Sequence, residues 1–357
     1  MKDQSKRIMR IALQIIVTVA LIAGLLWYIG IRSLISTLST LKIEYFALAF
    51  IAYFGINMLF ALRLMRVLKR DGEKLTFGIT LLAQYAGMLS SDLTPGRSGY
   101  FLTPVYLRDQ NVPTSKSLSA ILGIQTIEFL AKVAGGVGAI LFLVTTVPTT
   151  NWELFGSFAG INLGLLISGL GIALMLIGAL LLGAFTWSRR AMSLFNRIAN
   201  SRFLKRFTGG LMGKLEEYKD SAQKTRRAIP EIALVTVACW ILKGCEWYLL
   251  GYSLGITQIP WIGYFLIHPL VTALAFVPIT PAGVGVQEFG IVGIFTLMGI
   301  SSAPAGVFAL LSRVLLIIED LIGVPQITRS ASGLFSAHKT DSVEQQIENP
   351  QPLTTHT

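Results

Sequence analysis

The feature of this sequence that most constrains its fold is a series of long apolar segments. The first, Ile11–Ile31, has 21 residues without a charged side chain and lies between Arg10 and Arg32. About 20 apolar residues are enough for a helix to cross the ~30 Å hydrocarbon core of a bilayer. The segment is longer than the apolar region of a secretory signal, about 7–15 residues, and has no clear small-residue cleavage site. We therefore expect a retained membrane anchor.

The composition excludes most soluble classes of protein. Hydrophobic residues make up 53% of the 357 residues and charged residues only 14%, against about 25% charged in ordinary soluble chains. The net charge of +11 comes from basic residues between the apolar segments, which is typical of cytoplasmic loops and not of a nucleic-acid binder. Cys239 and Cys245 lie inside an apolar segment, which excludes a disulfide framework and a cysteine-based zinc site.

The basic clusters assign a topology to the segments. They lie before Ile11, directly after Leu62, and throughout 187–230, so the N-terminus and both loops are predicted to be cytoplasmic. An even number of crossings must separate two cytoplasmic loops, and the last span then returns the C-terminus to the cytoplasm. The six predicted spans are Ile11–Ile31, Tyr45–Leu62, Ser117–Val147, Ser157–Thr186, Glu231–Leu254 and Ala303–Val324.

Two further apolar regions do not fit this count of crossings. In Phe77–Leu107, two short halves are separated by the helix-breaking stretch Asp92–Ser98. In the second half of the chain, residues 278–285 separate Pro260–Val277 from Val286–Leu297 in the same way. Irregular backbone at membrane depth is tolerated only where protein buries it or where it lines a watery cavity. We therefore expect two re-entrant helical hairpins, the first entered from the cytoplasm and the second from outside.

The two interruptions share the motif T-P-x-x-x-G. It occurs at Thr94–Gly99 and again at Thr280–Gly285, each time before a long apolar helix. Paired Gly/Pro-interrupted segments in two halves of opposite orientation indicate an inverted repeat with a site near the bilayer midplane. The alternative is a bundle of eight spans in which both regions are ordinary kinked helices. The residues predicted to shape the hairpin backbone are Thr94, Pro95, Gly96, Gly99, Thr280, Pro281, Gly283 and Gly285.

The predicted fold class is all-α: a polytopic helical membrane protein with about six full spans and two re-entrant hairpins in an inverted repeat. Residues 1–328 form one transmembrane domain, with a first repeat at about 45–147, a basic loop at 187–230 and a second repeat at about 231–325. Residues 329–357 are polar and without periodicity, which predicts a disordered cytoplasmic tail.

The basic loop contains one periodic apolar pattern. Phe203, Phe207, Leu211 and Leu215 recur at every fourth position beside basic residues, which predicts an amphipathic helix. Such a helix either lies on an anionic membrane leaflet or packs beneath the bundle.

The motifs resemble those of a known family. The stretch Pro278–Glu288, followed by an apolar helix and Ala309–Arg313, resembles the transmembrane domain of bacterial lysylphosphatidylglycerol synthases. It also resembles the stand-alone flippase-like proteins of bacteria and archaea. The resemblance includes Thr94–Gly99 and covers most of residues 8–325. It implies a domain that binds or translocates lipid, built on inverted repeats with re-entrant helices. It does not imply the aminoacyltransferase reaction, which in that family belongs to a separate soluble domain. We therefore do not expect this chain to be an enzyme.

The first repeat departs from the pattern of the family. Tyr100 and Thr103 stand where relatives usually have a glutamate and an arginine. In the following helix Glu128 fits, whereas Phe129 and Lys132 replace the usual arginine and aspartate. The resemblance therefore implies an altered polar site in the first half.

Four ionisable residues inside apolar segments are the candidate site for a lipid headgroup or another transported group. Inserting a charged residue at the centre of a membrane helix costs about 2.5–3.5 kcal/mol, so a charged residue found there is a candidate for function. They are Arg97, Glu128, Glu288 and Arg313. Arg97, at the tip of the first hairpin, is suited to hold a phosphate, or else to pair with Asp92. Glu288 could couple protons or accept from headgroup hydroxyls, and Arg313 could neutralise Glu288 or bind an anionic headgroup.

Two pairs of ionisable residues and one histidine also have a structural interpretation. Glu128 and Lys132, and likewise Lys243 and Glu246, lie one helical turn apart and are expected to pair, and for Glu128 and Lys132 a functional role stays open beside the structural one. His268 is a lone histidine beside a proline, so core packing is favoured over a proton relay. The other two histidines lie in the tail, and no metal site or cofactor is predicted.

The leading functional hypothesis is a flippase or scramblase for a polar or anionic lipid, whose headgroup crosses between the two hairpins. Membrane lipids are the expected partners, together with a lipid-modifying enzyme or a second copy of the chain. One alternative is a transporter of small ions or anions on the same architecture. Another is a membrane partner of a lipid synthase or glycosyltransferase that transports nothing. The expected location is the cell membrane of a bacterium or archaeon.

Overall fold

The fold is described here from a computed structural model. It describes residues 2–153, 156–158, 161–188, 190, 211–275 and 280–332. The predicted amphipathic positions Phe203 and Phe207, and residues 333–357 of the predicted tail, lie outside these ranges.

Almost every described residue is in a helix, which confirms the all-α class. Two short strands, β1 (Ser157–Phe158) and β2 (Ile161–Asn162), form an antiparallel pair. The helices are α1 (Lys2–Ile29), α2 (Ile31–Ser39), α3 (Ile43–Arg70), α4 (Phe77–Asp92), η1 (Ser98–Leu102), α5 (Thr103–Arg108), α6 (Thr114–Thr146), α7 (Thr149–Trp152), α8 (Leu163–Trp187), α11 (Leu211–Arg227), α12 (Ile229–Ser253), α13 (Trp261–Ala275), α14 (Val286–Leu297), α15 (Ser302–Asp320) and η3 (Leu321–Gly323).

Four of the helices in the described ranges, α3, α6, α8 and α12, are long and apolar enough to cross a membrane. The bent pair α1 and α2, with an angle of 73° between the two helices, makes a fifth if it is counted as one span. The sixth predicted span contains the helix α15, which is not among these candidates. The protein is therefore a polytopic helical membrane protein, as predicted.

The first span ends earlier than predicted. The prediction placed its end at Ile31, but Gly30 has a φ of 83° and separates α1 from α2. Glycine occupies this left-handed region without the steric cost that a Cβ would bring. The chain therefore turns sharply after Ile29.

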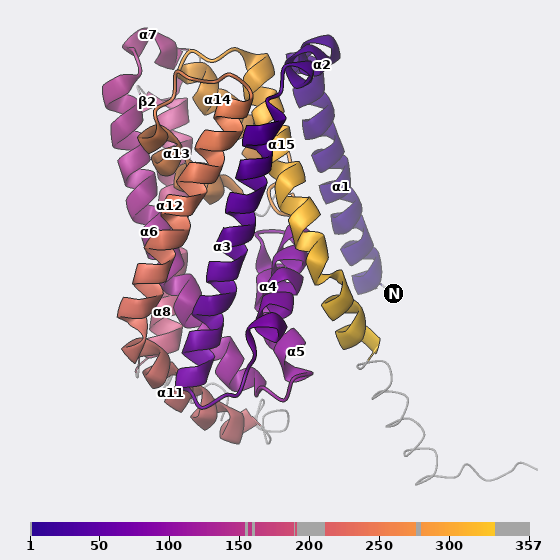
Figure 1. The fold of residues 1–357 in the computed structure, drawn as a ribbon, viewed down its shortest axis with the longest axis vertical. Coiled ribbons are helices and arrows are strands. Elements are labelled where there is room, and N and C mark those ends of the chain that lie inside the picture. Colours follow the sequence, from indigo (N-terminus) through magenta and orange to yellow (C-terminus); the bar gives the residue numbers. More distant parts are fainter. Residues whose placement is uncertain are drawn as a thin grey trace, which may run out of the picture.

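The two T-P-x-x-x-G regions turn back on themselves. Figure 1 shows α4 and α5 in one half of the bundle and α13 and α14 in the other half. The two pairs therefore reach into the bundle from opposite halves, the arrangement that the sequence predicted for two inverted hairpins. That each pair is re-entrant in a membrane stays a prediction.

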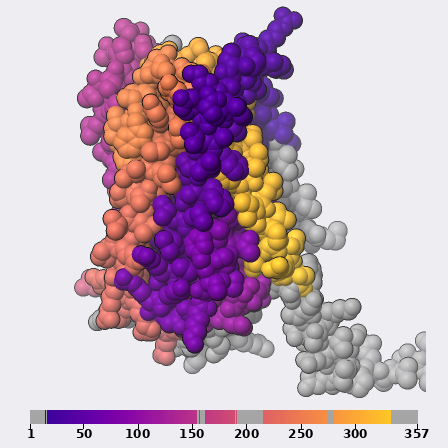
Figure 2. Space-filling view, in the orientation of Figure 1, coloured from indigo at the N-terminus to yellow at the C-terminus, as the bar shows by residue number. Residues whose placement is uncertain are grey.

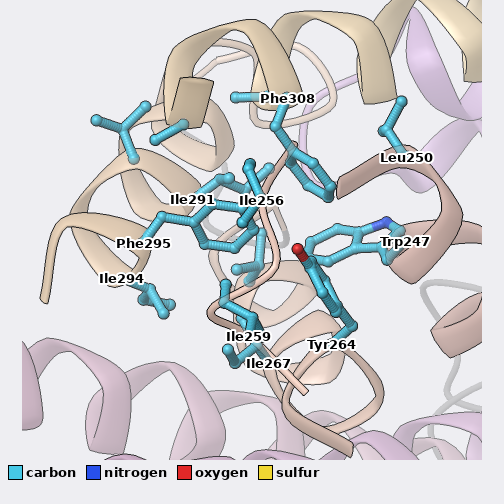
Figure 3. Close-up of a cluster of buried hydrophobic side chains, with 14 of the residues drawn as sticks. Trp247, Leu250, Ile256, Ile259, Tyr264, Ile267, Ile291, Ile294, Phe295 and Phe308 are labelled. Carbon is cyan, nitrogen blue, oxygen red and sulfur yellow. The ribbon is translucent and has the colours of Figure 1, made fainter. Parts of the chain in front are cut away.

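The centre of the bundle is formed by α3 and α12, which pack along their length. Figure 2 shows α3 along the middle of one face, with α12 and α15 beside it. Behind this face, an aromatic cluster joins α12, α13, α14 and α15 (Figure 3). The ring of Phe308 lies 4.8 Å from that of Phe295 and 5.2 Å from that of Trp247. This buried cluster fixes the second hairpin against two long helices.

One side of α8 carries an apolar stripe. Leu170, Leu174, Ile177 and Leu181 follow one another at intervals of three or four residues and are 50–66% exposed. Residues at this spacing lie on one face of a helix. Large exposed apolar patches mark membrane or protein contact surfaces, and on a helix long and apolar enough to cross a membrane this face suits contact with lipid.

The basic loop contributes α11 to one end of the bundle. Leu215, Tyr218 and Ala222 of α11 are buried with Leu122 of α6 in one small cluster. Of the four predicted amphipathic positions, only Leu215 has a described side chain, and it packs beneath the bundle.

The start of the predicted tail is ordered, which corrects the boundary at residue 329. Residues 324–332 are helical. Gln326 donates to the backbone oxygen of Tyr106 at 3.0 Å, and the Ser330 hydroxyl donates to the Asp109 carboxylate. These contacts to α5 and the turn after it hold a polar segment that the composition suggested was unstructured.

Candidate functional site

The tips of the two hairpins meet inside the bundle. Pro95 and Pro281 form an isolated antiparallel β-bridge. The backbone N–H of Ala282 donates to the backbone oxygen of Thr94 at 3.0 Å. The two T-P-x-x-x-G motifs, 186 positions apart in the sequence, are therefore in direct contact.

The two tips also have the same backbone conformation. At equivalent positions, φ is 60° at Gly96 and 46° at Ala282, and 55° at Arg97 and 69° at Gly283. The N–H of Arg97 donates to the oxygen of Thr94, and that of Gly283 to the oxygen of Thr280, at 3.2 and 3.3 Å. Left-handed conformations at non-glycine residues cost about 1–3 kcal/mol each. Each tip contains one such residue, Arg97 or Ala282, so the two motifs share a backbone turn as well as a sequence pattern.

Thr94 and Gly99 close the first hairpin. The Thr94 hydroxyl donates to the backbone oxygen of Ser90 and accepts from the N–H of Gly99 at 2.6 Å. A Cβ on Gly99 would lie 2.1 Å from the Ser90 oxygen, so only glycine fits there. The second hairpin is closed from outside, because a Cβ on Gly285 would lie 2.5 Å from the Cβ of Leu21 in α1.

A cavity of about 150 Å³ lies beside the hairpin tips. The spanning helices contribute residues from their central turns, such as Tyr53–Arg63 of α3 and Gln125–Lys132 of α6. The hairpins contribute Arg97 and Glu288. Five cationic side chains and two carboxylates line it, namely Arg63, Arg97, Lys132, Lys243 and Arg313, with Glu128 and Glu288.

All four predicted site residues therefore line one cavity. Arg97 forms the ion pair with Asp92 that the sequence offered as an alternative, with an N–O distance of 3.1 Å. Its Nε also donates to the Ser91 hydroxyl at 2.9 Å. The Arg97 side chain is 13% exposed, so the guanidinium is held at the tip by two neighbours and still reaches the cavity.

Glu128 is held by two cations from different helices. Lys132 lies 2.8 Å from one carboxylate oxygen, as the spacing of the two residues predicted, and Arg63 lies 2.9 Å from the other. Arg63 also donates to the Thr236 hydroxyl at 2.6 Å. The sequence prediction missed Arg63, because it placed the end of the second span at Leu62. The helix continues to Arg70, and the apolar Leu64, Val67 and Leu68 are the signal that could have shown this.

Glu288 and Arg313 form the ion pair that was one of their two predicted roles. The distance from Arg313 Nε to Glu288 Oε1 is 2.6 Å, and Arg313 also donates to Gln287 at 2.9 Å. The second oxygen of Glu288 accepts from the Gly285 N–H at 2.6 Å. A carboxylate in the first turn of a helix satisfies a free N–H and interacts favourably with the helix dipole. Glu288 thus joins the second hairpin tip to α15.

Lys243 and His268, which were predicted to have structural roles, also line the cavity. Lys243 pairs with Glu246 at 2.5 Å, as predicted, and its ammonium lies 4.5 Å from the centre of the Tyr53 ring. His268 packs edge-on against Trp247, with ring centres 4.9 Å apart, and contacts the hydroxyl of Thr272. Buried ions need partners of opposite charge. The five lining cations pair with four carboxylates, Glu128, Glu288, Asp92 and Glu246, which leaves one positive charge in excess.

Comparison with known proteins gives two matches. Residues 15–321 match the family described as the lysylphosphatidylglycerol synthase TM region. A curated relative, UPF0104 membrane protein PH1989 of Pyrococcus horikoshii, is 23% identical over 323 residues, which are 85% of this chain and 92% of the relative.

Proposed function

The chain belongs to the lysylphosphatidylglycerol synthase TM region family, and from this premise we propose that it binds an anionic lipid and moves its headgroup between leaflets. The observation that carries the proposal is the cavity at the hairpin tips, with its five cationic side chains and two carboxylates. A phosphate or other anion is the ligand that arginine and lysine side chains of this kind recognise.

The position of the cavity suits a ligand with apolar tails. The lining residues come from the central turns of spanning helices, at a depth where a headgroup would have to pass. The lipid tails would remain in the bilayer, beside apolar faces such as that of α8. No covalent chemistry by this chain is part of the proposal.

The tip contact would act as the barrier between the two ends of the path. The hydrogen bond from Ala282 to Thr94 and the bridge between Pro95 and Pro281 close the route between the hairpins. In our proposal the headgroup passes when these backbone contacts separate. Each hairpin opens toward a different end of the bundle, so alternating access would follow from moving one hairpin against the other.

We propose the cell membrane as the location, with both termini in the cytoplasm. The basic residues in the first turns of α1, in the last turns of α3 and in α11 support this orientation. Lipids of the bilayer are the proposed partners. The same cationic cavity would also fit a free phosphate or another small anion, and the experiment below separates these sources.

The proposal is tested by lipid retention and by lipid movement. The purified chain is analysed by native mass spectrometry after gentle detergent extraction, and then in vesicles with fluorescent phosphatidylglycerol, whose transfer is read by chemical quenching of the outer leaflet. We expect the wild type to retain an anionic lipid and to move the fluorescent lipid. Arg97→Ala should lose both properties.

The matched control is Arg66→Ala, since the Arg66 side chain is 54% exposed and pairs outside the cavity with Glu231. It should behave as the wild type does. Bulk lipid in the same proportions with wild type and Arg97→Ala, and no lipid movement, would refute the proposal. Uptake of inorganic phosphate without lipid movement would favour a transporter of free anions.

A further inference from the structure

A group of buried carboxyl groups lies next to the cationic cavity but does not line it. Asp320 and Glu319, at the end of α15, are 0% and 1% exposed. Asp92, at the end of α4, lies within hydrogen-bonding reach of Asp320. Asp92 also holds Arg97, at 3.1 Å. The arginine of the hairpin tip is therefore the link between the cavity and this acidic group.

The acidic group has fewer cations than carboxylates. Arg97 is the cation that contacts Asp92, whereas Lys243 is bonded to Glu246 at 2.5 Å. The groups that face Asp320 and Glu319 from the packed elements are Tyr53 and Asn57 of α3, Tyr85 and Asp92 of α4, Arg97 of the first hairpin tip, and Lys243 and Glu246 of α12. An uncompensated buried carboxylate is costly, so it binds a proton instead.

Buried oxygens without a hydrogen-bond partner also indicate that a proton binds in this acidic group. Within the described residues, one oxygen each of Asp92, Asp320 and Glu319 has no hydrogen-bond partner. Two further buried polar atoms that are not carboxylates share this state, Asn57 Oδ1 and the Tyr85 hydroxyl. The Asn57 amide contacts Glu319 through its Nδ2 at 3.5 Å, and Tyr53 contacts Asp320 at the same distance. The carboxylate oxygens and Asn57 Oδ1 lack a donor, whereas the Tyr85 hydroxyl can donate a hydrogen bond itself. No three His, Cys, Asp or Glu side chains in the described ranges are placed to hold a metal ion, and a proton is the ligand that supplies a donor to two facing carboxylates.

We propose that anion binding at Arg97 is coupled to the uptake of one proton by the Asp92–Asp320 pair. The proposal rests on the proposed function, because it requires an anionic headgroup at Arg97. Without the headgroup, the pair holds one proton, which Asp320 donates to Asp92, and the negative charge of Asp92 is balanced by Arg97.

The charges balance in both states. When a headgroup takes the guanidinium, the Arg97–Asp92 ion pair breaks and an Arg97–phosphate pair forms. Asp92 has then lost its cation and takes a proton from water onto its carboxylate oxygen. The set of Asp92, Asp320 and Arg97, together with the headgroup once it is bound, is neutral before and after binding, so this exchange leaves no unpaired charge in the low-dielectric interior. Lipid anion and proton are thus bound together, and a proton gradient would bias the direction in which the headgroup moves.

The coupling is measured by calorimetry on the full chain in phosphatidylcholine nanodiscs. Short-chain phosphatidylglycerol is the probe, because its phosphodiester keeps one charge between pH 6 and 8, whereas a phosphomonoester titrates near pH 6. Titrations in two buffers of different ionisation enthalpy give the number of protons taken up per lipid. For the wild type we expect a value close to one. At pH values where one proton is taken up per lipid, affinity should fall about tenfold for each unit of pH.

Asp92→Asn removes the group that takes up the proton. We expect its proton uptake to fall close to zero and its affinity for the probe to be independent of pH. The matched control is Glu231→Gln, which changes a carboxylate that is bonded to Arg66 and Arg70 away from the cavity. It should keep the proton uptake and pH dependence of the wild type.

The possible outcomes separate this inference from the proposed function. Binding of the probe to the wild type with equal heats in both buffers would overturn the coupling and leave the lipid site standing. Affinity that follows sodium concentration at constant pH would also overturn it. Failure of the wild type to bind any anionic lipid would overturn the proposed function, and the coupling with it. The wild-type measurement decides the question even if Asp92→Asn does not fold.

Discussion

The ion pair between Glu288 and Arg313 is expected to be a structural joint whose two members are strongly coupled. The Glu288 side chain is 2% exposed and that of Arg313 is 10% exposed. Glu288→Ala removes the partner of Arg313 and also the acceptor of the Gly285 N–H, which is bonded at 2.6 Å. Breaking a buried pair on one side typically costs about 3–5 kcal/mol, because the remaining charge stays buried without a partner.

A double-mutant cycle measures this coupling. Glu288→Ala and Arg313→Met are each expected to lower the free energy of unfolding by about 3 kcal/mol or more. The double variant no longer buries an unpaired ion, so it should lose at least about 2 kcal/mol less than the sum of the single changes. Glu288→Gln is a useful intermediate, because its side-chain oxygen can still accept from Gly285. It should therefore cost less than Glu288→Ala.

The assay is reversible unfolding in mixed micelles, followed by tryptophan fluorescence. Trp247 is a suitable reporter because it lies in the aromatic cluster that anchors the second hairpin. Additive losses, within about 0.5 kcal/mol, would show that the two side chains act independently. Such a result would refute the assignment of Glu288 as the joint between α14 and α15.

Three shorter predictions concern the hairpins and the surface. A disulfide should form readily between cysteines that replace Pro95 and Pro281 in a chain without its native cysteines, because directly bridged residues have the Cα separation that a disulfide requires. The disulfide is detected as a gel shift after mild oxidation. Failure to form it would contradict the contact between the tips. Gly99→Ala should lower the melting temperature and reduce the free energy of unfolding by about 1–3 kcal/mol or more, because the new Cβ clashes with the backbone of Ser90. Gly78→Ala is the control: no atom lies within 4 Å of its new Cβ, so it should be neutral or stabilising. Glu231→Gln should change the unfolding free energy by about 1 kcal/mol or less, because its partners Arg66 and Arg70 are half exposed; a larger loss would show that this surface pair matters more than its exposure indicates.

The sequence by itself determined the class of fold and the place of the hairpins. A span of about 20 apolar residues has no stable alternative to a membrane helix, since every backbone polar group must be satisfied within the bilayer. For the same reason, Pro and Gly in the middle of an apolar region mark where a helix must stop. The predicted helix Val286–Leu297 has the bounds that the structure gives, because Gly285 and the first-turn Glu288 define its start locally.

The sequence was less informative where neighbours decide the outcome. Gly30 ended the first span early, and the predicted disordered tail begins with residues that are helical, where Ser330 donates to Asp109. Arg63 was assigned to the end of a span because a charged residue after an apolar segment is usually a flank. Its burial depends on Glu128 and Thr236, which come from two other helices.

What only the tertiary structure decided is which charges meet. Spacing within one helix predicted the pairs of Glu128 with Lys132 and of Lys243 with Glu246, since residues one turn apart lie on the same face. It could not predict that two T-P-x-x-x-G tips, far apart in the sequence, would form a backbone bridge. Nor could it place Asp92 between Arg97 and Asp320. Local periodicity and the bilayer select helices, but the packing of those helices against one another determines the charged site.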